Sequence, residues 1–167
     1  HGRDVLGAAA LMEFTDRGSG PALLLIHGFP LARRIWTAQI EALSGAARVV
    51  APDLPGFGTT PVGTPPPAAM EDYARALLGL MDRLGAPTFT AAGHSMGGYV
   101  LFALHRLAPG RLAGAALVST RAIADAAETR KAREETALRA EREGAGFLVE
   151  SFPAKVFGPA PAPDQLE

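Results

Sequence analysis

Residues 88–99, Thr-Phe-Thr-Ala-Ala-Gly-His-Ser-Met-Gly-Gly-Tyr, decide how this chain folds. Their first half is typical of a buried strand, and the glycine-rich second half predicts a very tight turn followed by a helix. Ser95 stands at that turn, inside the pattern Gly93-x-Ser95-x-Gly97, which is the signature of a nucleophile elbow. Such a turn projects the serine hydroxyl away from the sheet, usually in a strained backbone conformation. Small neighbours are required because the strand and the helix approach each other closely.

Two further motifs stand earlier in the chain, each directly after an apolar run of strand length. His27-Gly28-Phe29-Pro30 follows residues 22–26, and Asp53-Leu54-Pro55-Gly56-Phe57-Gly58 follows the run that ends at Pro52. With Gly93-His94-Ser95-Met96-Gly97-Gly98 they occur in the order and spacing of the α/β-hydrolase superfamily. The chain therefore resembles small serine esterases, enol-lactone hydrolases and cofactor-free haloperoxidases. The resemblance is to the N-terminal portion of such proteins only.

The resemblance assigns a role to individual residues of these motifs. Ser95 corresponds to the nucleophile, which needs a general base beside it to take its proton. The main-chain N–H groups of Phe29 and Met96 correspond to the oxyanion hole, and the two side chains are expected to line the substrate pocket. Supporting roles, such as shaping the loop before Phe29 or allowing the tight turn, fall to His27, Gly28, Gly93, His94 and Gly97. The resemblance implies no metal and no cofactor.

The acid and the base of a triad are not evident. In this superfamily they follow the nucleophile in the chain, in the order Ser, Asp or Glu, His. No histidine follows His105, which lies ten residues into the expected helix, about 15 Å from Ser95 at 1.5 Å per residue. Asp53 precedes the nucleophile and is interpreted as a loop-fixing aspartate, and Asp125 stands too far beyond the next strand to be favoured. As written, the chain is not expected to assemble a Ser-His-Asp triad.

Length and composition indicate one soluble globular domain. The chain has 167 residues, 48% hydrophobic and 20% charged, with a net charge of −1, which argues against a nucleic-acid or anionic-membrane partner. It has no cysteine, so a disulfide framework is excluded, and a cytoplasmic location is expected. No apolar run approaches the length of a membrane span. The resemblance implies that the partner is a small-molecule ester or lactone.

Alternation of apolar runs and amphipathic stretches predicts an α/β fold with a mostly parallel sheet covered on both faces. Strands are expected at residues 22–26, 48–52, 88–92 and 113–119, after short opening strands at 5–10 and 11–15. Helices are expected at residues 33–43, 70–84, 96–107 and 126–143. Residues 59–67 are rich in proline and are expected to be irregular.

Three segments are expected along the chain. Residues 1–120 form the hydrolase-like core, residues 121–157 begin a helical cap, and residues 158–167 are a proline-rich linker and tail. Since proteins of this superfamily are usually longer, the C-terminal strands are expected to be absent from this chain. Strand 113–119 then becomes an apolar sheet edge that pairs with the missing C-terminal part or with another chain.

The favoured interpretation is a serine hydrolase of carboxylic esters or (enol-)lactones that works through an acyl-enzyme on Ser95. This fragment alone is expected to be inactive, because it lacks the acid and the base. One alternative is a catalytically incomplete hydrolase-fold protein used for binding or as a scaffold, and another is an enzyme completed in trans by a second chain. Epoxide hydrolases and haloalkane dehalogenases are disfavoured, since their elbow carries an aspartate where this chain has Ser95.

Overall fold

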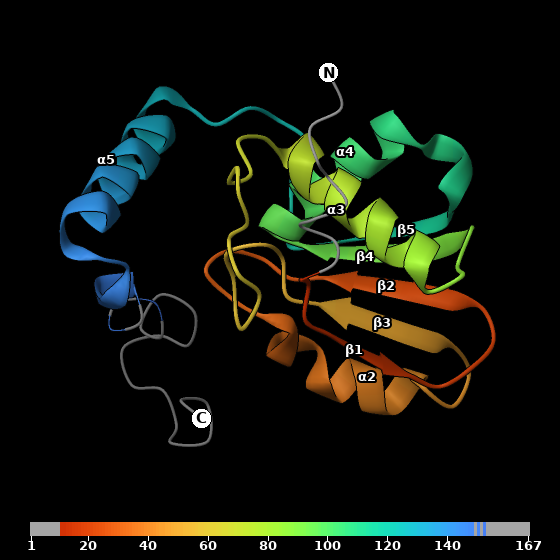
Figure 1. The fold of residues 1–167 in the computed structure, drawn as a ribbon. Coiled ribbons are helices and arrows are strands. Elements are labelled where there is room, and N and C mark those ends of the chain that lie inside the picture. The colour runs from red at the N-terminus through yellow and green to blue at the C-terminus, as the bar shows by residue number, and fades with distance from the viewer. Residues whose placement is uncertain (1–10, 149, 151, 153–167) are drawn as a thin grey trace. The chain divides into compact units, whose positions relative to one another are not determined.

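The computed structural model describes residues 11–148, 150 and 152 (Figure 1). It divides into two compact units, His1–Ala122 and Ile123–Glu167. The predicted opening strand at residues 5–10 and the predicted linker at 158–167 lie outside the described residues. The division into core, cap and linker stays a prediction.

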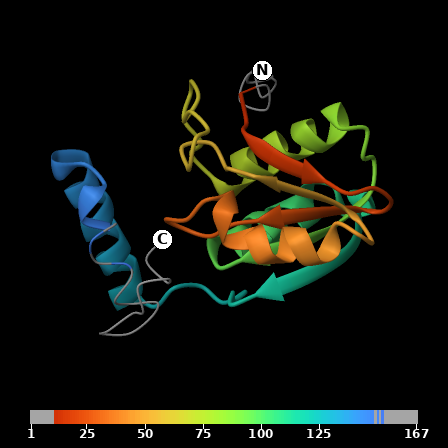
Figure 2. The same cartoon turned by 90° about the horizontal axis from the view of Figure 1, so that it is seen from below.

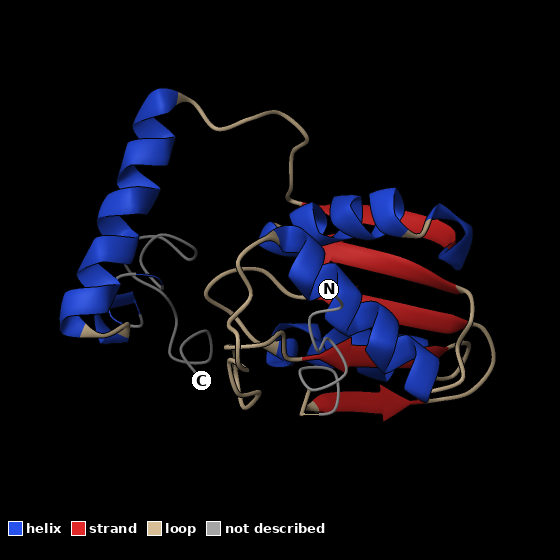
Figure 3. Cartoon of the chain, turned by 45° about the horizontal axis from the view of Figure 1, so that its top comes forward, coloured by secondary structure: helices blue, strands red, loops and turns tan. Residues whose placement is uncertain are grey.

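The first unit is built on a five-stranded sheet in the order β1-β3-β2-β4-β5. β2, β3, β4 and β5 run parallel to their neighbours, and β1 is antiparallel to β3. The α/β fold class and the mostly parallel sheet are therefore confirmed (Figure 3). The strands are β1 Phe14–Arg17, β2 Ala22–Ile26, β3 Arg48–Pro52, β4 Phe89–His94 and β5 Leu112–Val118.

Helices cover the two faces of the sheet (Figures 1 and 2). On one face α3 Met70–Arg83 and α4 Met96–Leu107 pack on side chains such as Leu24, Ile26 and Phe89. On the other face, η1 Arg33–Trp36 and α2 Thr37–Leu43 enclose the neighbouring strand positions, among them Leu25, Val49 and Ala92. Successive strand residues point to opposite faces, so continuous apolar strands bury both sides of the sheet.

Three boundaries differ from the sequence-based expectation. The predicted helix 33–43 is a 3₁₀ turn followed by an α-helix that begins at Thr37. The main-chain N–H of Arg33 donates a hydrogen bond to the Asp53 carboxylate, which fixes the start of this segment from another loop. The strand expected at 11–15 begins at Phe14, and the strand expected at 88–92 continues to His94, so that it leads directly into Ser95.

The edge strand β5 is poorly covered. It carries apolar side chains, yet most of its residues are exposed, and Leu117 retains 54% of its accessible surface. The short 3₁₀ turn η2 Pro109–Arg111 lies between α4 and β5. The second unit holds helix α5 Ala127–Glu143, none of whose residues is buried. In the described part of the chain, every helix is too short or too polar to cross a membrane, and the cytoplasmic location stays a prediction.

Candidate active site

The strand-to-helix turn places Ser95 between β4 and α4. Ser95 has φ 51° and ψ −114°, a conformation that residues with a Cβ rarely adopt. Its helix can follow so sharply because Gly97 lies against the main chain of Ile26 and His27, where a Cβ would overlap the Ile26 carbonyl. The turn therefore sits at the carboxyl end of the central strands, the edge at which open parallel sheets bind ligands.

The loop after β2 passes directly beside this turn. A Cβ built on Gly28 would lie 3.0 Å from the Cβ of Ser95 and 2.8 Å from Nδ1 of His94, so only glycine fits there. A hydrogen bond of 2.9 Å from the Leu31 N–H to the Gly28 carbonyl closes the loop. The structure thus brings the loop that follows β2 and the turn that follows β4 together at one point.

Two main-chain N–H groups at this point make no hydrogen bond within the described residues, those of Phe29 and Met96. The Met96 N–H is in the first turn of α4, where amides have no intrahelical partner and the helix dipole is positive. The Phe29 side chain is 43% exposed and meets Phe57 edge to face, with ring centroids 6.1 Å apart. Within the described residues, both amides therefore keep an unused hydrogen-bond donor.

His27 is buried and bonded on both ring nitrogens. Its Nε2 accepts a hydrogen bond of 3.0 Å from the Leu54 N–H, and its Nδ1 lies 3.0 Å from the Gly28 carbonyl. This pairing requires the proton on Nδ1, so the ring is neutral and joins the loops after β2 and β3. Burial lowers the pKa of His27. With both nitrogens engaged, this histidine holds the loop and has no nitrogen left to accept a proton from Ser95.

His94 directly precedes Ser95, and its ring packs against an aromatic side chain. Its ring is edge to face with Trp36, and among the described residues its Nδ1 and the Trp36 Nε1 are buried without a hydrogen-bond partner. Burial lowers the pKa of His94. His105 lies in the last turn of α4, at the opposite end of the helix from Ser95.

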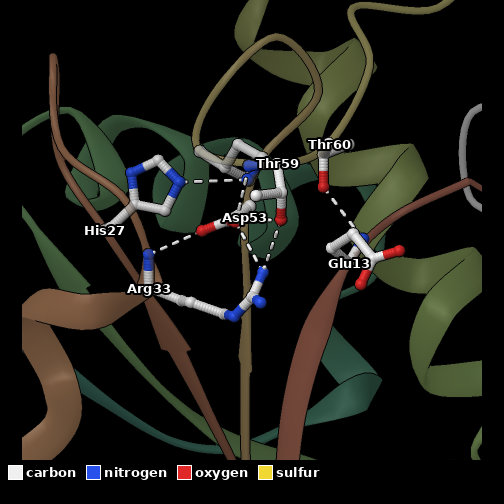
Figure 4. Close-up of polar contacts among 7 residues, drawn as sticks. Glu13, His27, Arg33, Asp53, Thr59 and Thr60 are labelled. Carbon is white, nitrogen blue, oxygen red and sulfur yellow. Dashed lines mark hydrogen bonds and ion pairs between the residues drawn. The ribbon is translucent and has the colours of Figure 1, made fainter.

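Asp53 is the buried centre of a polar network that fixes the surrounding loops (Figure 4). Its carboxylate accepts hydrogen bonds from the main-chain N–H and the guanidinium of Arg33, at 2.7 and 2.5 Å. It also accepts from the N–H and the hydroxyl of Thr59, at 3.0 and 3.2 Å. The network ties the segment after the Gly28 loop to the loop after β3. These contacts agree with the interpretation of Asp53 as a loop-fixing aspartate.

Sequence analysis missed three members of this site. Arg33 and Thr59 donate hydrogen bonds to Asp53, from which they are separated by 20 and 6 positions in the sequence. Thr120 donates a hydrogen bond to the Ser95 carbonyl. The Thr120 hydroxyl carries no local sequence signal, because its partner is a main-chain carbonyl 25 residues away. Asp125 lies in the second unit, where it pairs with Arg133. Within the described residues, His, Asp and Glu side chains form no cluster of three that could hold a metal ion.

Comparisons with known proteins give this arrangement a family context. Residues 21–156 match the family model described as alpha/beta hydrolase fold. The chain is 34% identical over 124 residues to bifunctional epoxide hydrolase 2 of Mus musculus, which covers 72% of this chain and 22% of that protein.

Solved structures give a similar result. A thermophilic esterase from Thermogutta terrifontis is 45% identical with a TM-score of 0.79, over 85% of this chain and 52% of that one. The enol-lactonase from Burkholderia xenovorans LB400 is 28% identical with a TM-score of 0.75, over 86% of this chain and 55% of that one. The chain thus spans about half the length of these solved structures, and less of the mouse relative.

Replacing Asp53 with alanine should lower the free energy of unfolding by about 3 kcal/mol, because the donors of Arg33 and Thr59 lose the buried carboxylate that accepts from them. The measurement is urea denaturation followed by circular dichroism. Asp16→Ala is the matched control: it breaks an ion pair with Arg48 on the surface, which should cost about 1 kcal/mol or less. An equal decrease in the free energy of unfolding in the two variants would contradict the structural role of Asp53.

Stability should also fall as the pH drops below about 6.5, the ordinary pKa of histidine. The lowered pKa of His27 means that the unfolded chain binds a proton in this range while the folded chain does not, and His94 acts with the same sign. The loss should reach up to about 1.4 kcal/mol per pH unit for His27. Urea denaturation at several pH values between 7.5 and 5.5 measures it. His27→Gln should flatten the slope, and stability that rises toward acid would refute the assignment.

Proposed function

The chain belongs to the alpha/beta hydrolase fold family, and on that premise we propose that it is part of a serine hydrolase acting on carboxylic esters or (enol-)lactones. The observation that carries the proposal is the strained turn at Ser95 with Gly28 directly against it, while the N–H groups of Phe29 and Met96 make no hydrogen bond within the described residues. The esterase and the enol-lactonase among the similar structures support the same substrate class.

In the proposed mechanism the hydroxyl oxygen of Ser95 attacks the carbonyl carbon, and its proton passes to a general base. The carbonyl oxygen becomes an oxyanion, which the N–H groups of Phe29 and Met96 stabilise; one such donor is commonly worth about 3 kcal/mol of barrier. The C–O bond to the alcohol then breaks, the alcohol leaves with a proton, and an acyl-enzyme on Ser95 remains for water to hydrolyse.

The identity of the nucleophile favours acyl substrates over epoxides, although several epoxide hydrolases are among the relatives. A carboxylate that opens an epoxide forms an ester, whose carbonyl water can attack to release the product. A serine that opened an epoxide would form an ether, which has no carbonyl and would trap the enzyme. An acyl group on Ser95 keeps a carbonyl and turns over.

The general base and its acid come, in this proposal, from residues outside this chain. The described histidines do not supply a base: His27 is bonded on both nitrogens, His94 packs on Trp36, and His105 lies at the far end of α4. Similar structures are about twice as long as the segment they share with this chain. The 167-residue chain alone should therefore be inactive.

The exposed apolar edge at β5 fits the same proposal. We propose that β5 pairs with a strand of the longer protein and, in the 167-residue chain alone, with a second copy. Leu117 and Val118 on this strand are 54% and 37% exposed, and unpaired edges of apolar strands favour association.

Ser95→Ala should abolish hydrolysis of p-nitrophenyl acetate by the whole protein while its fold stays intact, because losing the nucleophile removes the acyl-enzyme route. A fluorophosphonate probe, followed by mass, should label the whole protein at Ser95 rapidly and the 167-residue chain slowly or not at all. Ser44→Ala, which removes an exposed hydroxyl on the same unit, is the control and should label normally.

The outcomes separate the alternatives. Rapid stoichiometric labelling of the short chain would mean that it contains a base, with His94 the first residue to examine. A whole protein that neither labels nor hydrolyses would favour the binding or scaffold function instead.

The edge proposal predicts that the 167-residue chain associates at micromolar concentration in sedimentation velocity. Leu117→Lys should shift it toward monomer, because a charge on an edge strand opposes pairing. Leu138→Lys is the matched control, since Leu138 is 57% exposed on α5 rather than on the sheet edge. A wild-type chain that remains monomeric throughout would refute edge pairing.

A further inference from the structure

We propose that Thr120 is a positioning residue for the nucleophile, whose hydroxyl holds the turn at Ser95 in the conformation required for attack. This inference rests on the proposed function of Ser95 and adds a residue to it. Thr120 follows β5, 25 residues along the chain from Ser95, and touches the turn from a separate segment.

The main chain of Ser95 is bound on both sides. The Thr120 hydroxyl donates a hydrogen bond of 2.8 Å to the Ser95 carbonyl, and the Gly98 N–H donates one of 2.9 Å to the same oxygen. The Ser95 N–H donates at 3.0 Å to the carbonyl of Val118. Within the described residues the Ser95 side-chain hydroxyl makes no hydrogen bond, so the backbone is fixed while the reacting group is left available.

This binding matters because Ser95 is strained. A serine at φ 51° and ψ −114° relaxes toward the common regions of backbone space unless its surroundings hold it. A hydrogen bond from a distant segment supplies such a hold, because it resists rotation of the peptide that carries the carbonyl. Loss of the hydroxyl should therefore move the Ser95 oxygen relative to the Met96 N–H.

The threonine side chain also lies directly on the first turn of α4. A Cβ on Gly98 would lie 2.6 Å from the Cβ of Thr120, so the second glycine after Met96 is matched to this side chain. The same side chain that leaves no room for a Cβ on Gly98 donates its hydroxyl to the Ser95 carbonyl. The pair Gly98 and Thr120 thus joins the end of β5 to the turn.

A second threonine offers a matched control. The Thr37 hydroxyl also donates to a main-chain carbonyl at 2.8 Å, that of Arg34, but this bond is local and exposed at the start of α2. Thr120→Val and Thr37→Val make the same chemical change at equal bond length. Thr120→Ser keeps the hydroxyl while removing the methyl group.

The experiment has two readouts. In the 167-residue chain, hydrogen exchange by NMR reports the Ser95 and Gly98 amides, which should exchange faster in Thr120→Val than in Thr120→Ser or Thr37→Val. In the whole protein, kcat for p-nitrophenyl acetate should fall about 10- to 100-fold in Thr120→Val with KM unchanged, since small misplacements of reacting groups have effects of this size. Fluorophosphonate should still label every Thr120→Val molecule, only more slowly.

Each outcome decides the proposal. Wild-type exchange and kcat in Thr120→Val would overturn it, as would a Thr120→Ser variant as impaired as the valine. Fewer labelled molecules with an unchanged rate per labelled site would show a purely structural role and would also overturn it. A wild-type protein without labelling or hydrolysis would overturn the proposed function of Ser95, and the exchange of the two amides would still decide whether Thr120 holds the turn.

Discussion

The strained turn at Ser95 is the constraint on which the rest of the first unit depends. Holding a serine at φ 51° costs about 1–3 kcal/mol, which the surrounding packing must offset. The turn reverses the chain so sharply that α4 begins against the end of β2, where Gly97 has no room for a side chain. The close approach of α4 to the end of β2 therefore depends on glycine at position 97.

The loops around the turn depend on buried polar groups rather than on apolar contact. Asp53 binds Arg33 and Thr59, while His27 joins Leu54 to the Gly28 carbonyl. Buried polar networks that are fully bonded fix one geometry, because any rearrangement would leave a donor or acceptor unpaired. The Phe29 amide thus owes its position beside Ser95 to a carboxylate and an imidazole that take no part in the proposed chemistry.

The local sequence was sufficient to predict the central strands and the turn at Ser95. Residues 22–26 and 48–52 are apolar runs buried on both faces, and their bounds agree with β2 and β3. The turn was predictable because only glycine tolerates such close approach. Arg33, Thr59 and Thr120 were not predictable, since each acts on a partner that the fold brings near and no local pattern marks. The same reason explains why the helix expected at 33–43 divides: Asp53 binds its first residue from another loop.

The contacts that hold Ser95 all lie within the first unit: Val118 and Thr120 at the end of β5, Gly98 in α4, and the close approach of Gly97 to β2. The geometry of the proposed nucleophile is therefore complete without the base that would activate it. Residues of a triad act as a unit, so a preformed nucleophile without its base contributes little to the rate. It follows that adding a base could restore chemistry without refolding the turn, whereas relaxing the turn would disable the site even with a base in place.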